Sequence, residues 1–347
     1  MTPIRVLIVD DSATIRALLA EILSRDPGIA VVGQAPEPHA ARQMIKDLNP
    51  DVLTLDVEMP GMSGIEFLER IMRLRPMPVV MVSTLTERGA EVTLDALAIG
   101  AVEYFPKPMD NVAANLHAAA DELIRKVKTA AAAKVRARPE RRPAAHKPEM
   151  AFGDHLIAIG SSTGGVEALL EVLSHFPANC PPTVITQHMP AGFTASFAAR
   201  LDKLCAPKVA EAVDGQLLAA GHVWLAPGAV SHLEVTGRAA WRCRLVRDAP
   251  TGGHRPSVDR LFQSVAASAG AKGVGVILTG MGRDGASGLS AMRTNGAATI
   301  GQDEASATVY GMPRVAMEIG AVQRQLPLEK IGEQILRLCR VPSLEEV

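Results

Sequence analysis

Acidic side chains, a serine and a lysine stand where short apolar segments end in the first third of the chain. Asp10 and Asp11 follow RVLIV, Asp56 ends LTLD, Ser83 ends PVVMVS, and Lys107 follows YFP. A single aspartate in such a place more often caps a helix than binds a metal. Three carboxylates brought together repel one another unless a cation lies between them, and Mg²⁺ prefers such hard oxygen ligands. The set can hold a phosphoryl group on an aspartate, with Mg²⁺ and the lysine neutralising its charge.

A second group of reactive residues lies in the other half of the chain. Ser161 and Ser162 occur in the glycine-rich stretch GSSTGG, His188 ends TVITQH, and Asp284 follows an apolar segment in LTGMGRDG. A serine on a strand-to-helix turn has its hydroxyl beside backbone amides that stabilise an oxyanion, but it needs a base. An imidazole can be that base, and a carboxylate behind it maintains the required tautomer. These residues predict acyl transfer by a serine nucleophile, and either serine fits at this point.

The glycine-rich stretch has other interpretations. Dinucleotide-binding turns carry G-x-G-x-x-G with an acidic residue after the next strand, and Walker loops carry G-K-[ST]; GSSTGG contains neither pattern, and the next expected strand, TVITQH, ends in a histidine. Asp284 can instead cap the helix expected at GASGLSAMRTN. The chain order Ser, His, Asp also differs from the common hydrolase orders. The nucleophile interpretation is favoured because it accounts for the serine turn, the histidine and the aspartate together.

Parallel sheets would bring these residues to common edges. Before the stretch AAAAKVRARP, apolar segments of four to seven residues alternate with longer stretches whose apolar residues recur at spacings of three and four. Nearly continuous apolar strands between amphipathic helices are typical of a parallel sheet covered on both faces. Five such units predict an α/β domain with a doubly wound five-stranded parallel sheet, whose ligands bind at the carboxyl ends of the strands. The expected strands are RVLIVDD, AVVGQ, DVLTLD, PVVMVS and AVEYF.

The alternation resumes in the second half, with LIAIG, TVITQH, VWLAP and VGVILTG as expected strands. SHLEV and RCRLV flank TGRAA and predict a hairpin, so we expect an α/β domain with a mostly parallel sheet.

Between the halves, an Ala-, Pro- and Arg-rich stretch lacks patterned apolar residues and predicts an exposed linker, although a basic run can also bind an acidic partner. The expected organisation is a first domain over residues 1–125, a basic linker over 126–152 and a second domain over 153–345.

Composition excludes several classes of protein. The net charge of −1 gives no overall basic field for nucleic acid or anionic membrane, and the four cysteines are scattered without a C-x-x-C pair. The start MTPIRVLIVDD is too short an apolar stretch for a signal peptide, and no apolar run reaches the length of a spanning helix. We therefore expect a cytoplasmic protein without membrane insertion. A DNA-binding output is disfavoured because no strongly basic helix follows the linker.

The first domain resembles the response-regulator receiver family. The matching residues are the Asp10–Asp11 pair, Asp56 in LDVEMPGMSG, Ser83, and Lys107 before a proline. The resemblance implies phosphotransfer from a chemotaxis histidine kinase to Asp56, with Mg²⁺ held by the three aspartates. Ser83 and Lys107 would respond to the phosphoryl group. The family's aromatic switch position corresponds to Tyr104, which could equally be a half-buried tyrosine at a strand end.

The second domain resembles the family of chemotaxis protein-glutamate methylesterases, from residue 153 to about 340. IGSSTGG, QHMP, HRPSVDRLF, LTGMGRDGASG and QDEASATVYGMP occur in the family's order. The resemblance implies that Ser162 is the nucleophile, His188 the base and Asp284 the orienting acid. It also implies that the Met281 N–H is an oxyanion donor and that Thr163 lines the site.

The resemblance implies a carboxylic ester hydrolase that removes methyl groups from glutamate γ-methyl esters of methyl-accepting chemotaxis receptors. The same chemistry would deamidate receptor glutamines, and phosphorylation of the receiver would activate both reactions. The esterase itself is expected to need no cofactor. The alternative is a response regulator whose second domain is a binding module without catalysis. His254, Arg255 and Ser257 form a polar cluster expected to line the cleft, with an N-cap role for Ser257 equally open.

Overall fold

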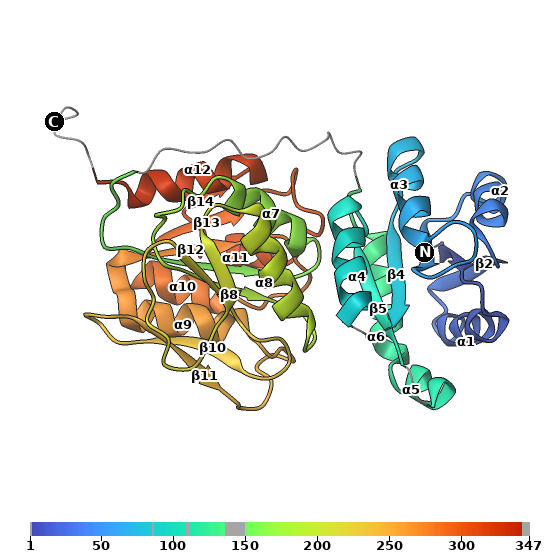
Figure 1. Ribbon diagram of the computed structural model, residues 1–347, viewed down its shortest axis with the longest axis horizontal. Coiled ribbons are helices and arrows are strands. Elements are labelled where there is room, and N and C mark those ends of the chain that lie inside the picture. Colours follow the sequence, from blue (N-terminus) through green and yellow to red (C-terminus); the bar gives the residue numbers. More distant parts are fainter. Residues whose placement is uncertain (1, 85–86, 109–110, 136–149, 342–347) are drawn as a thin grey trace. The chain divides into compact units, whose positions relative to one another are not determined.

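The chain forms two compact α/β units in a computed structural model, over residues 1–141 and 142–347. The structure describes residues 2–84, 87–108, 111–135 and 150–341 (Figure 1). Part of the expected linker, residues 136–149, and the end of the expected second domain, residues 342–345, lie outside this range.

The first unit is built on a five-stranded parallel sheet in the order β2-β1-β3-β4-β5. This order confirms the predicted doubly wound fold, because the chain runs outward from β1 in both directions. The strands are β1 (Ile4–Val9), β2 (Ile29–Ala35), β3 (Val52–Asp56), β4 (Val79–Thr84) and β5 (Glu103–Lys107). The helices are α1 (Ala13–Leu23), α2 (Pro38–Leu48), α3 (Gly64–Leu74), α4 (Glu87–Ile99), α5 (Val112–Ala118) and α6 (Ala120–Ala131).

Helix α6 completes the core of the first unit and continues past residue 125. Val127 and Ala130 are fully buried among side chains of α1 and the sheet. The apolar positions of α6 recur at helical spacing on the face that packs inward. The packed part of this unit therefore includes residues that the sequence assigns to the linker.

A buried ion pair ties α6 to β5. Lys126 Nζ lies 3.1 Å from Glu103 Oε2, and both side chains are nearly inaccessible. Lys126→Met should destabilise this unit by about 3–5 kcal/mol, because the Glu103 carboxylate would remain buried without its cation. Lys128→Met removes an ion pair to Asp26 whose lysine is 42% exposed, and should cost less than about 1 kcal/mol. Hydrogen exchange at β5 amides measures both; equal losses would show that burial of the pair is unimportant.

The second unit is built on a seven-stranded sheet in the order β14-β13-β12-β6-β7-β9-β8. All its strand pairs are parallel, which confirms the mostly parallel sheet. The strands are β6 (Leu156–Ser161), β7 (Thr183–Gln187), β8 (Lys208–Glu211), β9 (His222–Leu225), β12 (Gly273–Ile277), β13 (Ala298–Gln302) and β14 (Arg324–Leu326). The helices are α7 (Gly165–Ser174), α8 (Phe193–Leu204), α9 (Val258–Ala269), α10 (Ala286–Thr294), α11 (Met312–Glu318) and α12 (Leu328–Cys339), with a 3-10 turn at Gly270–Lys272.

The predicted hairpin is also present, as a separate antiparallel pair. β10 (His232–Thr236) pairs with β11 (Arg242–Val246), and β10 packs on α9 (Figure 1). Leu233 and Val235 alternate inward to join the core that α9 shares with the sheet. Three sheet strands, β8, β13 and β14, were not among the expected ones. β8 and β14 are short and half exposed, so they lack the continuous apolar run that marked the others.

Helices cover both faces of the second sheet. α9, α10 and α11 pack together, and α7 contacts α8 and α12. Side chains of β6 alternate between the faces, so that Leu156 and Ala158 join the core formed with α9. β6 lies between β7 and β12, where the chain order of the sheet reverses. This is the place where doubly wound sheets form ligand crevices. Within the described residues, no helix is long and apolar enough to cross a membrane.

Candidate active site

Ser162 directly follows β6, and its backbone is held from three directions. Its N–H donates to the Thr279 carbonyl at 3.0 Å, and its carbonyl accepts from Gly165 N at 2.8 Å and from Gln187 Nε2 at 2.9 Å. Ser161 is fully buried and donates to Gln187 Oε1 at 2.6 Å. The two serines therefore have different roles. Ser161 binds the glutamine that holds the turn, whereas Ser162 is partly exposed at the carboxyl end of the central strand β6.

Two glycines are required by the geometry of this turn. Gly164 has φ 76°, in the left-handed region that favours glycine. Gly165 begins α7 with no space for a side chain, because a Cβ there would lie 2.0 Å from Gln187 Oε1. The glycine-rich stretch thus brings the helix start close to the strand end, with backbone amides beside Ser162.

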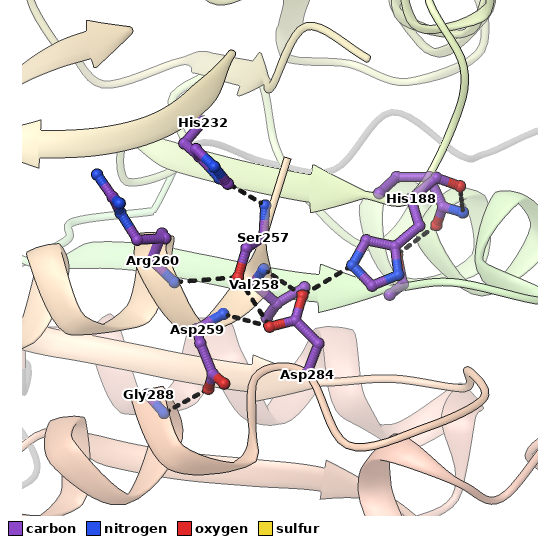
Figure 2. Close-up of polar contacts among 10 residues, drawn as sticks. His188, His232, Ser257, Val258, Asp259, Arg260, Asp284 and Gly288 are labelled. Atoms are coloured by element: carbon purple, nitrogen blue, oxygen red, sulfur yellow. Dashed lines mark hydrogen bonds and ion pairs between the residues drawn. The ribbon is translucent and has the colours of Figure 1, made fainter. Parts of the chain in front are cut away.

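His188 lies next to Ser162 because their strands are paired in register. Ser161 of β6 is opposite Gln187 of β7, and His188 N donates to the Ser161 carbonyl at 3.1 Å. His188 Nε2 lies 2.8 Å from Asp284 Oδ2 (Figure 2). The ring's other nitrogen, Nδ1, is buried and has no hydrogen-bond partner among the described residues. Since Asp284 takes the Nε2 proton, Nδ1 is the nitrogen available as a base.

Asp284 receives four hydrogen bonds (Figure 2). Besides His188, they come from Ser257 Oγ at 2.8 Å, Val258 N at 2.7 Å and Asp259 N at 3.0 Å. Burial by itself would raise the pKa of Asp284, but His188 and the backbone amides lower it to about 2. The positive end of the α9 dipole favours the same charge state. Asp284 is therefore a carboxylate throughout the neutral pH range.

The alternative role for Asp284, as the cap of the next helix, is wrong. The residue that precedes α10 is Gly285, and the free amide of Gly288 in the first turn of α10 donates to Asp259 rather than to Asp284. Asp284 instead accepts amides at the start of α9, which precedes it in the chain by about 26 residues. Only the tertiary structure reveals this pairing, since the two segments are joined by packing of α9 against β6 and α10.

The charge of Asp284 should make the second unit sensitive to acid. Its pKa is lowered from 3.8 to about 2, so its contribution of roughly 2–3 kcal/mol is complete above pH 4 and is lost as the pH falls through 2. Urea unfolding followed by the fluorescence of Trp224 and Trp241, both in this unit, measures the loss. Asp284→Asn should lack this portion of the pH dependence. Parallel curves for the two proteins would contradict the assignment of the charge.

The segment after β12 closes the other side of Ser162. A Cβ on Gly280 would lie 2.8 Å from Ser162 Cβ and 2.3 Å from Met312 Sδ, so this backbone packs directly on the serine. Met281 follows Gly280 and thus lies at the same edge. Thr163 is buried, and its carbonyl accepts from Thr279 Oγ1 at 2.9 Å. The carboxyl ends of three adjacent strands, β12, β6 and β7, therefore bring together the expected site residues Ser162, Thr163, His188, Met281 and Asp284.

The expected polar cluster divides between two tasks. Ser257 caps α9 by accepting from Arg260 N and also donates to Asp284. His254 stacks on His188, with ring centroids 3.9 Å apart and planes 3° from parallel. Arg255 instead extends to the carbonyls of Ala229 and Asp248, so it supports the loop rather than the catalytic pair.

One residue of this network was missed by the sequence analysis. His232 of β10 is buried, and its Nδ1 accepts from Ser257 N at 3.1 Å (Figure 2). Its Nε2 lies 3.1 Å from the Ala249 carbonyl. The ring thus bridges the Ser257 amide and the Ala249 carbonyl, and it supports the start of α9. A lone histidine in a hairpin strand carries no local signal for such a role.

The carboxylates of the first unit also meet at one edge. Lys107 Nζ lies 2.7 Å from both Asp10 Oδ2 and Asp56 Oδ2, and oxygens of Asp10, Asp11 and Asp56 lie within 4.8 Å of one another. Ser12 caps α1, and its N–H donates to Asp10 Oδ1 at 3.0 Å, which orients that carboxylate. Burial raises the pKa of Asp56 to about 6, against the opposing charge of Lys107.

The two remaining residues of the expected switch lie on the neighbouring strands. Ser83 is buried on β4, where it pairs with Pro106 of β5. Tyr104 is buried on β5, and Lys126 Nζ lies 4.7 Å from the centre of its ring. Tyr104 is therefore an interior side chain here, rather than a half-buried one.

Comparisons with known proteins match both units. A family model described as CheB methylesterase covers residues 157–335, and one described as response regulator receiver domain covers residues 6–121. A protein of Caulobacter vibrioides, named protein-glutamate methylesterase/protein-glutamine glutaminase 1, is 62% identical over 97% of this chain and 98% of its own. A Rhizobium etli protein named protein-glutamate methylesterase/protein-glutamine glutaminase is 58% identical over 97% of this chain and 96% of its own.

A solved structure resembles the second unit. The crystal structure of the Thermotoga maritima CheB methylesterase catalytic domain is 36% identical, with a TM-score of 0.52, and covers 54% of this chain and 99% of that one. The chain therefore belongs to the CheB methylesterase family and carries a response regulator receiver domain ahead of the methylesterase domain.

Proposed function

We propose that the protein hydrolyses glutamate γ-methyl esters on methyl-accepting chemotaxis receptors and deamidates receptor glutamines. The observation that carries this proposal is the short contact between His188 and Asp284, whose carboxylate is buried and charged. The register of β6 and β7 brings His188 beside Ser162. Relatives named protein-glutamate methylesterase/protein-glutamine glutaminase span nearly the whole chain. The receiver then extends from residue 1 through the end of α6, past the expected boundary at residue 125, and the esterase occupies residues 153–345.

The proposed reaction uses a seryl acyl-enzyme. His188 Nδ1 takes the proton of the Ser162 hydroxyl as its oxygen attacks the ester carbonyl, and Asp284 stabilises the resulting imidazolium. The Met281 N–H, beside the carbonyl-binding space that Thr163 lines, donates to the oxyanion. Collapse expels methanol, which takes its proton from His188. Water, activated by the same nitrogen, then hydrolyses the acyl-enzyme, and a glutamine substrate would release ammonia instead.

Within the described residues no hydrogen bond joins the Ser162 hydroxyl to His188. Catalytic hydrogen bonds are often long in ligand-free proteins and shorten when substrate binds. The esterase residues carry the whole of this chemistry without a cofactor, since the base, the nucleophile and the oxyanion donor are all protein groups.

The receiver provides control in this proposal. A histidine kinase would phosphorylate Asp56, and Ser83, Tyr104 and Lys107 would respond to the new charge. The cluster of Asp10, Asp11 and Asp56 fits Mg²⁺, because three carboxylate oxygens converge within 4.8 Å. Bound there, Mg²⁺ would neutralise charge on the transferring phosphoryl group, while Lys107 supplies a second positive charge from its place between Asp10 and Asp56.

Methanol release from methylated receptor membranes tests the activity. The proposal expects release by the full chain and an increase when a small phosphodonor is added. No release under either condition would favour the alternative, a second domain that acts by binding alone. A gel shift at low salt tests the DNA-binding alternative. The proposal expects no shift of the DNA.

Phosphorylation should act through Asp56 alone. Asp56→Asn keeps the size of the side chain but cannot accept the phosphoryl group, so it should retain basal methanol release and lose the increase caused by the phosphodonor. That increase is expected to be about 10- to 100-fold, the range that a few kcal/mol of differential stabilisation allows. A variant that still responds to the phosphodonor would place the phosphorylation site elsewhere.

A further inference from the structure

We propose that His254 is a positioning residue, which stacks on the catalytic base and keeps the Nδ1 of His188 directed at Ser162. This inference rests on the proposed function, because it assigns His254 a task in the same reaction. The observation behind it is the parallel stack of the two imidazoles, with centroids 3.9 Å apart and planes 3° from parallel.

The hydrogen bond to Asp284 does not by itself fix the plane of the His188 ring. Nε2 is held at 2.8 Å from Asp284 Oδ2, while Nδ1 has no partner among the described residues. A ring held at one atom can still tilt about that contact, which moves the lone pair of Nδ1 away from the serine hydroxyl. A flat neighbour at van der Waals distance opposes this tilt, because it lies parallel to the ring and contacts its face.

The loop that carries His254 is built to hold a side chain in place. Thr251 and His254 exchange two backbone hydrogen bonds of 3.0 Å across the tight turn that Gly252 and Gly253 form. Both glycines have positive φ, 59° and 85°, as a two-residue hairpin turn requires. Arg255 then fastens the loop to the carbonyls of Ala229 and Asp248. His254 is thus presented by an anchored turn rather than by a free loop.

Stacking also suits the charge that His188 acquires. When His188 takes the proton from Ser162 it becomes an imidazolium, and the face of an aromatic ring attracts a cation. The neighbouring anion, Asp284, contacts His188 at Nε2, on the ring's edge, whereas His254 stacks on its face, so the two supports act in different directions. This position therefore requires an aromatic face against His188, which the His254 ring provides.

The test compares His254→Leu with His254→Phe, using methanol release from methylated receptor membranes. The leucine variant should lower kcat by about 10- to 100-fold, the scale of a misplaced catalytic group, with KM nearly unchanged. The phenylalanine variant keeps a flat aromatic face and should recover most of kcat. As a matched control, His222→Leu removes a second stacked histidine of the same unit, 5.8 Å from Trp224 between centroids, and should leave kcat unchanged.

Two results would overturn the inference. A leucine variant with full kcat would show that the stack does not position the base. Equal losses in both variants with a raised KM would mean that His254 binds substrate. A thermal unfolding curve for each variant separates these outcomes from misfolding. Failure of the wild-type chain to release methanol would instead refute the proposed function, so the two failures are distinguishable.

Discussion

Replacing Ser162 by alanine should reduce methanol release to about one part in 10⁶ of the wild-type rate, because the members of a catalytic triad act as a unit. The substitution removes only the hydroxyl group. The backbone contacts of Ser162 with Thr279, Gly165 and Gln187 do not involve the side chain and should persist. The variant should therefore fold normally and still bind receptor membranes.

Ser161→Ala is the matched control, since it removes the hydroxyl group of the neighbouring serine. Ser161 is fully buried and donates to Gln187, so its loss should cost about 1–2 kcal/mol of stability. Most of the methanol release should remain, because Gln187 can still donate to the Ser162 carbonyl. If Ser161→Ala is the inactive variant and Ser162→Ala is active, the nucleophile is assigned one residue too late.

Asp284→Asn should lower kcat by about 10⁴-fold, as loss of the carboxylate does in the best-studied triad. The structure explains why an amide cannot substitute. Each carboxylate oxygen accepts one backbone N–H, from Val258 or from Asp259, so the new NH₂ group faces a donor in either orientation. With the NH₂ toward His188, the imidazole would have to accept at Nε2, and the proton would move to the nitrogen needed as the base.

Asp259→Asn provides the control for this variant. The Asp259 side chain accepts from Gly288 N at 2.7 Å, and its own backbone N–H, which contacts Asp284, is retained in the variant. Both variants should lose some stability, but only Asp284→Asn should lose turnover. An Asp284→Asn enzyme with a near-normal rate would mean that Asp284 only stabilises the start of α9, and that another group orients His188.

Much of the fold follows from local pattern. Apolar segments such as LIAIG and VGVILTG are buried on both faces, and a strand of that kind has a stable place only inside a parallel sheet. The short strands β8 and β14 lack this signal because they are the two edge strands of the sheet, where part of each strand remains exposed. Their pairing depends on neighbours that local pattern does not identify.

For the site, the sequence by itself determined which reactive groups stand at strand ends: the serines of GSSTGG, His188 and Asp284. Parallel strands bring their carboxyl ends to one edge, so proximity followed from the pattern. Only the tertiary structure decided that Asp284 accepts the amides of α9, that His232 supports Ser257, and that His254 stacks on His188. The physical reason is that these contacts join segments distant in sequence through the packing of α9 and the hairpin, and no local periodicity encodes such contacts.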